Sequence, residues 1–431
     1  MKHLSKYLCL LLGLALLNPM FLLRVEAQSA ASGFQIPATD DGLPGEGPIR
    51  RYEWFKRLWE RKRSQWAKDV TKDQGALVFL GDSITQGWGP EMKGMFPGVK
   101  VANRGISGDT TRGVLIRMKE DVLSLNPSGV VLLIGTNDLE EGAAPEIIAS
   151  NLGLILSELK KHDSSMPIVL SLVFPSSASK KRPADKIQKI NELYLALVKG
   201  DEQVTPVETW RLFANEAGDA VKAEFPDLLH PNDAGYRKWA AALKPILATE
   251  GFLEKEADVF TPEPGFRMLF NGKDLTGWGF REKKTLKKQE QFDGKKASGD
   301  GRYEAIHGRL VVTTPPEYRR IQQLWTTEEF GRDFTLKLEF RATPYADSGV
   351  FVRKPQLQCR DYPLAGPYTE LKGYKAQDWN ELVIRVRGNL AHCTCNGEIL
   401  NEAMKLPASG PIGLEGDRGQ MEYRRIRIRM D

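Results

Sequence analysis

The spacing of apolar residues divides the chain into two halves with different periods. Between residues 76 and 248, short Val/Ile/Leu runs alternate with longer segments whose apolar positions recur every three to four residues. The apolar runs are 76–80, 99–103, 129–134, 167–173 and 204–208, and the helical segments lie near 111–125, 145–162, 184–199 and 232–248. Continuous apolar strands separated by helices predict a parallel sheet covered on both faces. We therefore expect an α/β domain with three layers over residues 50–250.

The helical period disappears in the second half, where apolar and polar residues alternate. Phe334, Leu336, Leu338 and Phe340 are separated by polar residues, and segments near 382–386 and 426–430 repeat this pattern. Asn396-Gly397 favours a tight hairpin turn. The pattern predicts an antiparallel β-sandwich or jelly roll over residues 265–431. Residues 251–264 are acidic and contain Thr-Pro-Glu-Pro-Gly, which predicts an interdomain linker.

The amino terminus has the pattern of a secretory signal peptide. Lys2 and Lys6 precede an apolar run at 8–23, and Val25 and Ala27 place small residues before a cleavage point. A membrane anchor is the alternative, which Asn18-Pro19 disfavours by interrupting the run. We expect a signal peptide at 1–27, a secreted or periplasmic mature chain from about Gln28, and no membrane-spanning segment in that mature chain. A tether is expected at 28–49.

A helix is expected over residues 50–70, where Trp54, Phe55, Trp59 and Trp66 form an apolar stripe among Arg and Lys. Such a basic amphipathic helix could contact a membrane surface. Packing of the stripe against the following domain is the interpretation we favour.

Charge and cysteine content narrow the possible partners. The net charge is +5, and the first 27 residues contribute +2 of it, so the mature chain has no basic excess typical of a nucleic-acid binder. Three cysteines remain, which allow at most one disulfide, from Cys359 to either Cys393 or Cys395. No Cys/His spacing typical of a metal site is present, and we expect no metal and no cofactor.

Groups suited to acyl transfer follow four of the expected strands. Ser83 lies in FLGDSIT after the first strand, Gly108 follows the second, Asn137 the third, and Asp227 and His230 the fifth. The carboxyl ends of parallel strands meet at one edge of a sheet. We predict that Ser83 attacks, His230 takes its proton and Asp227 orients the imidazole. The N–H groups of Ser83 and Gly108 and the Asn137 amide would form the oxyanion hole.

These blocks, with NRGISGDTT, VVLLIGTNDL and D-x-x-H-P-N in order from about 52 to 250, resemble the SGNH (GDSL) hydrolase/esterase superfamily. The branch they resemble contains platelet-activating-factor acetylhydrolase subunits and bacterial carbohydrate acetylesterases. The resemblance implies a flavodoxin-like αβα fold with strand order 2-1-3-4-5. It also implies a metal-free serine esterase that removes small acyl groups.

Residues that flank these blocks are expected to have structural roles. Asp82 and Asp138 would brace loops, and Asp109 and Thr110 would cap a helix. The basic residues 180–182 lie in a loop expected to overhang the site, where we interpret them as a solvated charge run.

The second half resembles a family of secreted 3-keto-disaccharide hydrolases with a concanavalin-like jelly roll. The resemblance rests on LFNGKDLTGW at 269–278 and GPIGLE at 410–415, whereas the stretch 355–371 is shorter than in longer members. It implies a role in polysaccharide degradation. Polar residues expected to face a solvent-filled cleft and bind sugar are Arg353, Gln358, Arg360, Asp361 and Glu370, although an ordinary charged face is the alternative. Tryptophans that would either stack on sugar or lie in the core are Trp278, Trp325 and Trp379.

Together these features predict a secreted serine esterase that removes acetyl or other small acyl groups, with carbohydrate as the expected substrate. The second domain would hydrolyse or bind glycosides. Two alternatives remain open at this point. One is a lysophospholipase-like lipid esterase, and the other is an esterase joined to a non-catalytic lectin-like module.

Overall fold

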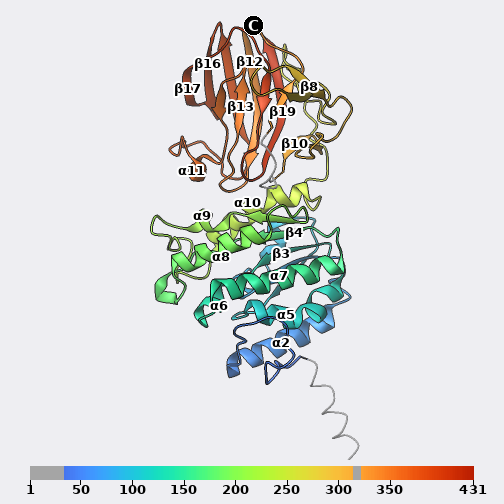
Figure 1. Cartoon of the computed structure of the whole chain (residues 1–431), viewed down its shortest axis with the longest axis vertical. Helices are drawn as coiled ribbons and strands as arrows, with labels where there is room; N and C mark the ends of the chain where they lie inside the picture. The colour runs from blue at the N-terminus through green and yellow to red at the C-terminus, as the bar shows by residue number, and fades with distance from the viewer. Residues whose placement is uncertain (1–33, 314–321) are drawn as a thin grey trace, which may run out of the picture.

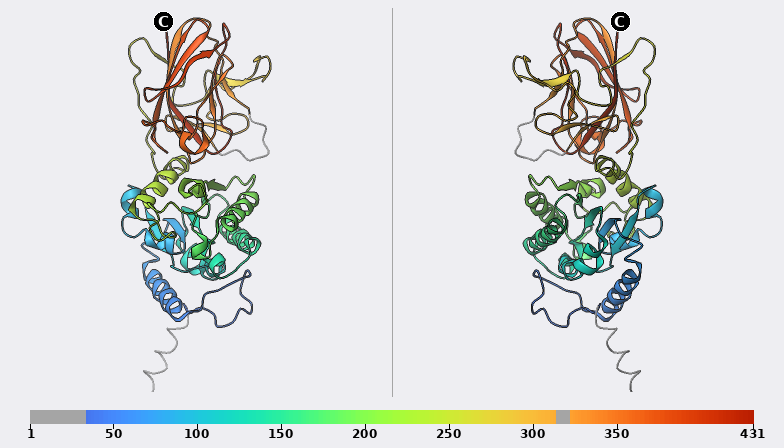
Figure 2. Two further views of the ribbon diagram at one scale, coloured as in Figure 1. Left: turned by 90° about the vertical axis from the view of Figure 1, so that its left-hand side faces the viewer. Right: turned by 90° about the vertical axis from the view of Figure 1, so that its right-hand side faces the viewer.

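The computed structural model describes residues 34–313 and 322–431, so the predicted signal peptide at 1–27 lies outside the described residues. An αβα domain and an all-β domain are stacked along the long axis of the molecule, and α10 (Asp233–Thr249) lies between them (Figure 1). Two opposite side views show the same stacking (Figure 2). No helix of the described ranges is long and apolar enough to cross a membrane.

The first domain contains a five-stranded parallel sheet in the order β2-β1-β3-β4-β5, which confirms the predicted fold. Its strands are β1 (Leu77–Gly81), β2 (Val101–Gly105), β3 (Gly129–Leu133), β4 (Ile168–Ser171) and β5 (Val204–Val207). Alternate side chains of β1 enter two separate cores: Val78 and Leu80 join one cluster, and Leu77 and Phe79 join the other. Because both faces of the sheet are buried, the inner strands β1 and β3 are apolar throughout, whereas the edge strand β2 contains Asn103 and Arg104.

Helices cover both faces of this sheet, and each face contributes to its own hydrophobic cluster. The helices before α10 are α2 (Glu53–Asp69), α3 (Ser83–Gly87), α4 (Met92–Met95), α5 (Thr111–Asp121), η1 (Leu123–Leu125), α6 (Thr136–Glu140), α7 (Pro145–His162), η2 (Ala178–Lys180), α8 (Ala184–Leu197) and α9 (Thr209–Phe213). Phe55, Trp59 and Trp66 of α2 are buried with Ile106, as the packed-helix interpretation predicts. Trp54 is the exception in the stripe, since nearly half of it is exposed.

The second domain is an antiparallel sandwich of an eight-stranded and a six-stranded sheet, consistent with the predicted jelly roll. The larger sheet contains β6 (Arg267–Met268), β9 (Tyr303–Ile306), β10 (Arg309–Val312), β12 (Phe334–Ala342), β15 (Asn380–Arg387), β16 (Leu390–Cys395), β17 (Glu398–Lys405) and β19 (Met421–Met430). The smaller one contains β7 (Trp278–Arg281), β8 (Lys288–Gln291), β11 (Leu324–Thr326), β13 (Gly349–Val352), β14 (Gln356–Gln358) and β18 (Ile412–Leu414), and α11 (Tyr362–Ala365) follows β14. The apolar positions of β12 are fully buried, as their alternation predicts.

The segment predicted as a linker is packed against the second domain. Glu254 accepts hydrogen bonds from Arg341 at 2.8 and 2.9 Å, and Asp258 pairs with Arg425 at 2.8 Å. Glu263 pairs with Arg427. Each carboxylate meets a guanidinium of the β-sheet, so residues 254–263 are anchored along much of their length.

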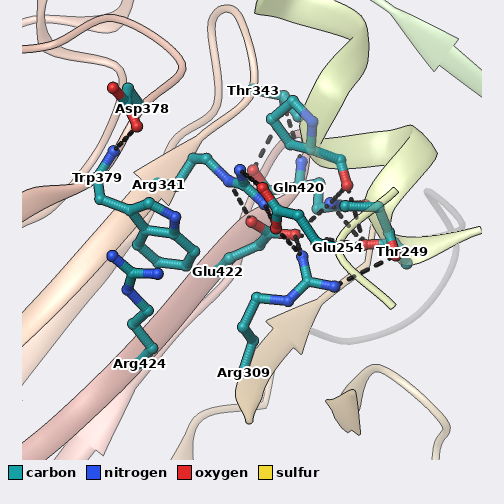
Figure 3. A network of polar contacts seen from close by, with 12 residues as sticks. Thr249, Glu254, Arg309, Arg341, Thr343, Asp378, Trp379, Gln420, Glu422 and Arg424 are labelled. Carbon is teal, nitrogen blue, oxygen red and sulfur yellow. Dashed lines mark hydrogen bonds and ion pairs between the residues drawn. The ribbon is translucent and has the colours of Figure 1, made fainter. Parts of the chain in front are cut away.

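A buried polar network joins the two domains at the carboxyl end of α10 (Figure 3). Glu422 is fully buried and accepts hydrogen bonds from Arg309 and Arg341. Arg309 also donates to the Ala248 carbonyl at 3.2 Å, and Gln420 donates to the Pro245 carbonyl at 3.1 Å. The Ala248 carbonyl is among the last four of α10, which have no partner within a helix, so the Arg309 guanidinium helps to satisfy the end of α10. This network fixes the orientation of the two domains.

Candidate active site

The sheet brings the four predicted blocks to one edge. Gly81 and Gly105 are paired at the ends of β1 and β2, so the segments that carry Ser83 and Gly108 begin side by side. Asn137 lies in α6 after the neighbouring strand β3. His230 reaches the same edge from the loop before α10, because its ring contacts Ser83.

Ser83, His230 and Asp227 form a continuous hydrogen-bonded chain. His230 Nε2 lies 2.9 Å from Ser83 Oγ, and His230 Nδ1 lies 2.7 Å from Asp227 Oδ2. The other Asp227 oxygen accepts from the backbone N–H groups of Leu229 and His230 at 3.0 and 2.8 Å. The D-x-x-H spacing therefore closes a turn that holds carboxylate and imidazole together.

The charge of Asp227 is fixed by its hydrogen bonds. Partial burial raises its pKa, but the backbone and ring N–H groups of His230 and the N–H of Leu229 outweigh this and lower the pKa to about 2. Asp227 is thus a carboxylate at neutral pH. A carboxylate at Nδ1 stabilises the imidazolium that forms when Nε2 accepts a proton.

Ser83 is the first residue of α3, and Asp82 caps that helix by accepting from the Ile84 N–H at 2.9 Å. Because the first N–H groups of a helix have no intrahelical acceptor, the Ser83 N–H is available to a substrate oxygen. Burial raises the pKa of Asp82 to about 6. Asp82 thus braces the loop between β1 and α3, which is the role predicted from the sequence.

Asn137 is buried and held from both ends of its amide. Its Nδ2 donates to the Asp109 carbonyl at 2.9 Å, and its Oδ1 accepts from Arg182 Nη2 at 2.9 Å. A side-chain amide has two N–H donors, so one remains for an incoming oxyanion. The bond to Asp109 also ties Asn137 to the loop that contains Gly108.

Gly108 has φ +89° and is covered by the amino-terminal segment. A Cβ added to it would lie 2.7 Å from Trp54 Cη2 and 3.0 Å from Arg50 Nη1. Both the backbone conformation and the space require glycine here. Arg50, Trp54 and Phe55, predicted from the sequence only as part of a helix packed on the domain, therefore contact the predicted oxyanion loop.

Arg182 is a site residue that sequence reasoning missed. It was expected to be solvated with its neighbours, but it is buried and that prediction is wrong. Its guanidinium donates to Asn137 Oδ1, to Glu140 Oε2 at 2.8 Å and to the carbonyls of Thr136 and Lys180. These acceptors compensate for the burial of the charge. Glu140 also pairs with Arg50, which links the amino-terminal segment to Asn137.

Three other predicted structural residues contact α5. Asp138 accepts from the Thr111 N–H at 3.1 Å and from its hydroxyl at 2.6 Å, and burial raises its pKa to about 7. Thr110 caps α5 by accepting from the Gly113 N–H. Asp109, expected as a cap, instead forms a buried ion pair with Arg117 at 2.7 Å.

The candidate sugar-binding residues of the second domain do not share one solvent-facing surface. Arg353 is buried and donates to the carbonyls of Phe330, Arg332, Gly388 and Pro407. Asp361 is buried too, where it accepts from the Tyr345 N–H and the Tyr374 hydroxyl. The predicted exposure of Arg353 and Asp361 is therefore wrong: both side chains satisfy groups inside the domain.

The remaining candidates are more accessible. Gln358 and Arg360 are half-buried and bonded to each other, and Arg360 also pairs with Asp347 at 2.8 Å. Glu370 is exposed and lines an open depression of about 680 Å³ together with Tyr368 and Glu398.

The tryptophans and cysteines of the second domain are mostly core residues. Trp278 and Trp325 are buried. Trp379 lies between the guanidinium groups of Arg341 and Arg424, whose central carbons are 4.7 and 4.0 Å from the centroid of its ring (Figure 3). The three cysteines expected in the mature chain are buried free thiols. Across residues 34–313 and 322–431, no cluster of His, Cys, Asp or Glu is placed to hold a metal ion.

The fold and the Ser–His–Asp arrangement are those of a serine hydrolase that acts on ester bonds. Residues 79–238 match the GDSL-like lipase/acylhydrolase family, and residues 265–429 match the 3-keto-alpha-glucoside-1,2-lyase-like domain. The chain therefore contains a GDSL-family hydrolase domain followed by a domain of this second family.

Several known proteins are similar to parts of this chain. Platelet-activating factor acetylhydrolase IB subunit alpha2 of Bos taurus is 25% identical over 196 residues, which are 44% of this chain and 83% of that protein. An acetylxylan esterase of Geobacillus stearothermophilus is 35% identical over 86 residues, 15% of this chain and 39% of that protein. A solved GDSL-like lipase from Bacteroides thetaiotaomicron is 27% identical with a TM-score of 0.38, covering 45% of this chain and 97% of that one.

Proposed function

We propose that the first domain is a serine esterase that removes acetyl or other small acyl groups from carbohydrate. The observation that carries the proposal is the chain from Ser83 Oγ through His230 to Asp227, with contacts of 2.9 and 2.7 Å. In this proposal the amino-terminal 27 residues are a signal peptide and the mature chain, from about Gln28, acts in a secreted or periplasmic compartment.

The proposed reaction has two steps. Ser83 Oγ attacks the ester carbonyl carbon while His230 Nε2 accepts the hydroxyl proton, and the Ser83 and Gly108 N–H groups and the Asn137 amide bind the oxyanion. The imidazolium then protonates the departing sugar oxygen, which leaves an acyl-Ser83. In the second step a water gives a proton to His230 Nε2 while its oxygen attacks the acyl carbon. The acyl–Oγ bond then breaks, the imidazolium returns the proton to Ser83 Oγ, and the acid is released.

Carbohydrate is favoured as the acyl carrier for two reasons. The second domain belongs to a family named for the cleavage of 3-keto-glucosides, and one relative of the first domain is named an acetylxylan esterase. We infer that the second domain binds or cleaves glycosides, and that the depression beside Glu370 is where it does so. A glycan array probed with the full Ser83→Ala chain, and turnover of 3-keto-glycosides by the same protein, separate binding from cleavage.

The esterase proposal is tested by acetate release from acetylated xylo-oligosaccharides and from p-nitrophenyl acetate. Ser83→Ala should lower turnover of both by about a thousandfold or more, because the nucleophile is lost. Ser164→Ala, an exposed serine in the loop before β4, is the matched control and should keep wild-type turnover. Retention of more than about a hundredth of turnover in Ser83→Ala would refute the nucleophile. Wild-type turnover of the nitrophenyl ester alone would refute the carbohydrate substrate.

A further inference from the structure

An exposed aromatic pair lies at the start of α2, outside the region that matches the hydrolase family. Tyr52 and Trp54 are 52% and 47% exposed, whereas their neighbour Phe55 is 1% exposed. The two rings are nearly parallel, with an interplanar angle of 11° and centroids 6.4 Å apart. Core packing does not account for two large rings that remain half in solvent.

This pair borders the candidate active site. A Cβ on Gly108 would lie 2.7 Å from Trp54 Cη2, so the indole is in van der Waals contact with the glycine itself. Gly108 follows β2 directly beside the segment that carries Ser83. A substrate whose carbonyl oxygen is bound at the Gly108 N–H would therefore lie close to Trp54.

The pair is also held in place. The Tyr52 hydroxyl donates to Glu141 Oε2 at 3.2 Å, and Arg50 Nε donates to Glu141 Oε1 at 2.7 Å. Trp54 packs edge-on against the buried Phe55, with centroids 5.6 Å apart. Arg50 and Glu140 continue these contacts to Arg182. The rings are thus preorganised relative to the predicted oxyanion hole, which lowers the entropic cost of binding a ligand.

We propose that Tyr52 and Trp54 form a subsite that stacks a pyranose ring of the ester-bearing carbohydrate. The electron-rich faces of aromatic rings attract the C–H groups of a sugar ring. Glu140 and Glu141 lie at the same rim, are partly exposed and supply carboxylate acceptors for hydroxyl groups. An acyl lipid would need a continuous apolar surface, which this charged rim interrupts. The inference rests on the proposed esterase function and specifies how its substrate is selected.

Kinetics on two substrates test the subsite. Trp54→Ala should lower the ratio of kcat/KM on acetylated xylo-oligosaccharide to that on p-nitrophenyl acetate by about tenfold, mainly through KM, because the indole ring stacks on a sugar that p-nitrophenyl acetate lacks. Trp54→Phe, which keeps a flat ring, should restore most of the ratio. Leu154→Ala removes a comparably exposed apolar side chain from α7 and should not change it.

Binding gives a second readout that does not need catalysis. In a Ser83→Ala background, calorimetry should show that Trp54→Ala weakens binding of the acetylated oligosaccharide by about tenfold. An equal loss of kcat/KM on both substrates would mean that Trp54 only supports Gly108. An unchanged ratio of the two kcat/KM values, together with unchanged binding of the oligosaccharide, would mean that Trp54 does not contact the sugar. Either result overturns the subsite. Absence of turnover on every ester, with binding that still depends on Trp54, would instead refute the esterase proposal alone.

Discussion

Asn137 illustrates how a neutral side chain can act on a developing charge. Its amide is fixed between the Asp109 carbonyl and Arg182, so it needs no reorganisation when the carbonyl oxygen becomes negative. Asn137→Ala should lower kcat by about 10²–10³ with little change in KM. Asn137→Asp should be at least as damaging, since a carboxylate repels the oxyanion. Thermal unfolding recorded in parallel checks folding, and a lowered melting temperature with intact kcat would exclude Asn137 from the mechanism.

Arg182 is expected to act through Asn137 as a positioning residue. Arg182→Met removes a charged hydrogen bond to Asn137 Oδ1 and should lower kcat by about tenfold to a hundredfold at similar KM. The decisive readout is the double-mutant cycle. If Arg182 only orients Asn137, Arg182→Met should lower kcat only slightly in an Asn137→Ala background. Fully additive losses would show that Arg182 acts in another way.

Sequence reasoning is informative where a residue directly follows its strand, and it fails where distant segments surround a side chain. Ser83 follows β1 in a short motif, so strand order alone brings it to the edge of the sheet, whereas His230 lies beyond α9 and reaches Ser83 from the loop before α10. Arg182 and Arg353 are buried because carbonyls from distant segments surround them, and the four acceptors of Arg353 lie between residues 330 and 407. A pattern of local charges contains no information about such acceptors.

At the level of elements, Asp138 connects the start of α6 to the first turn of α5. Burial raises its pKa to about 7, against the usual 3.8, so the folded state binds this proton more tightly than the unfolded chain. This tighter proton binding contributes on the order of 4 kcal/mol to the free energy of unfolding. The contribution is fully present below about pH 4 and is lost as pH rises through 7. Asp138→Asn keeps a neutral hydrogen-bonding group at this position.

We therefore predict that Asp138→Asn reduces the loss of stability between pH 5.5 and 8.5. Denaturant unfolding at the two pH values measures the free energy of unfolding, and Asp41→Asn, at an exposed position, is the matched control. An equal pH dependence in wild type, Asp138→Asn and the control would show that Asp138 does not hold a proton in this range.

The elements themselves were predictable to different degrees. Strands buried on both faces, such as β1 and β3, read as continuous apolar runs, and β12 shows strict alternation because only one of its faces meets the core between the sheets. Residues 251–264 read as a linker because they are acidic and rich in proline. Their anchoring depends on arginines in β12 and β19, more than 80 residues away in sequence.

At the scale of the whole molecule, Glu422 is the group on which the interdomain network depends. It is buried between Arg309 and Arg341, so Glu422→Ala would leave two buried cations without this carboxylate. We expect the free energy of unfolding to fall by about 3–5 kcal/mol. Turnover of p-nitrophenyl acetate by folded protein should stay at the wild-type value, since the network is remote from Ser83. Glu402→Ala, an exposed glutamate on β17, is the control, and a loss no larger than the control's would refute the role of Glu422.

The central claim is that Ser83 is the nucleophile of a His230-assisted esterase, and covalent labelling tests it most directly. The full chain would be treated with a fluorophosphonate, digested and sequenced by mass spectrometry. The account predicts one phosphonyl group per chain on Ser83, no label in Ser83→Ala, and labelling slowed by about a thousandfold or more in His230→Ala. Labelling of a different serine, or persistent esterase activity in protein whose Ser83 is fully phosphonylated, would contradict it.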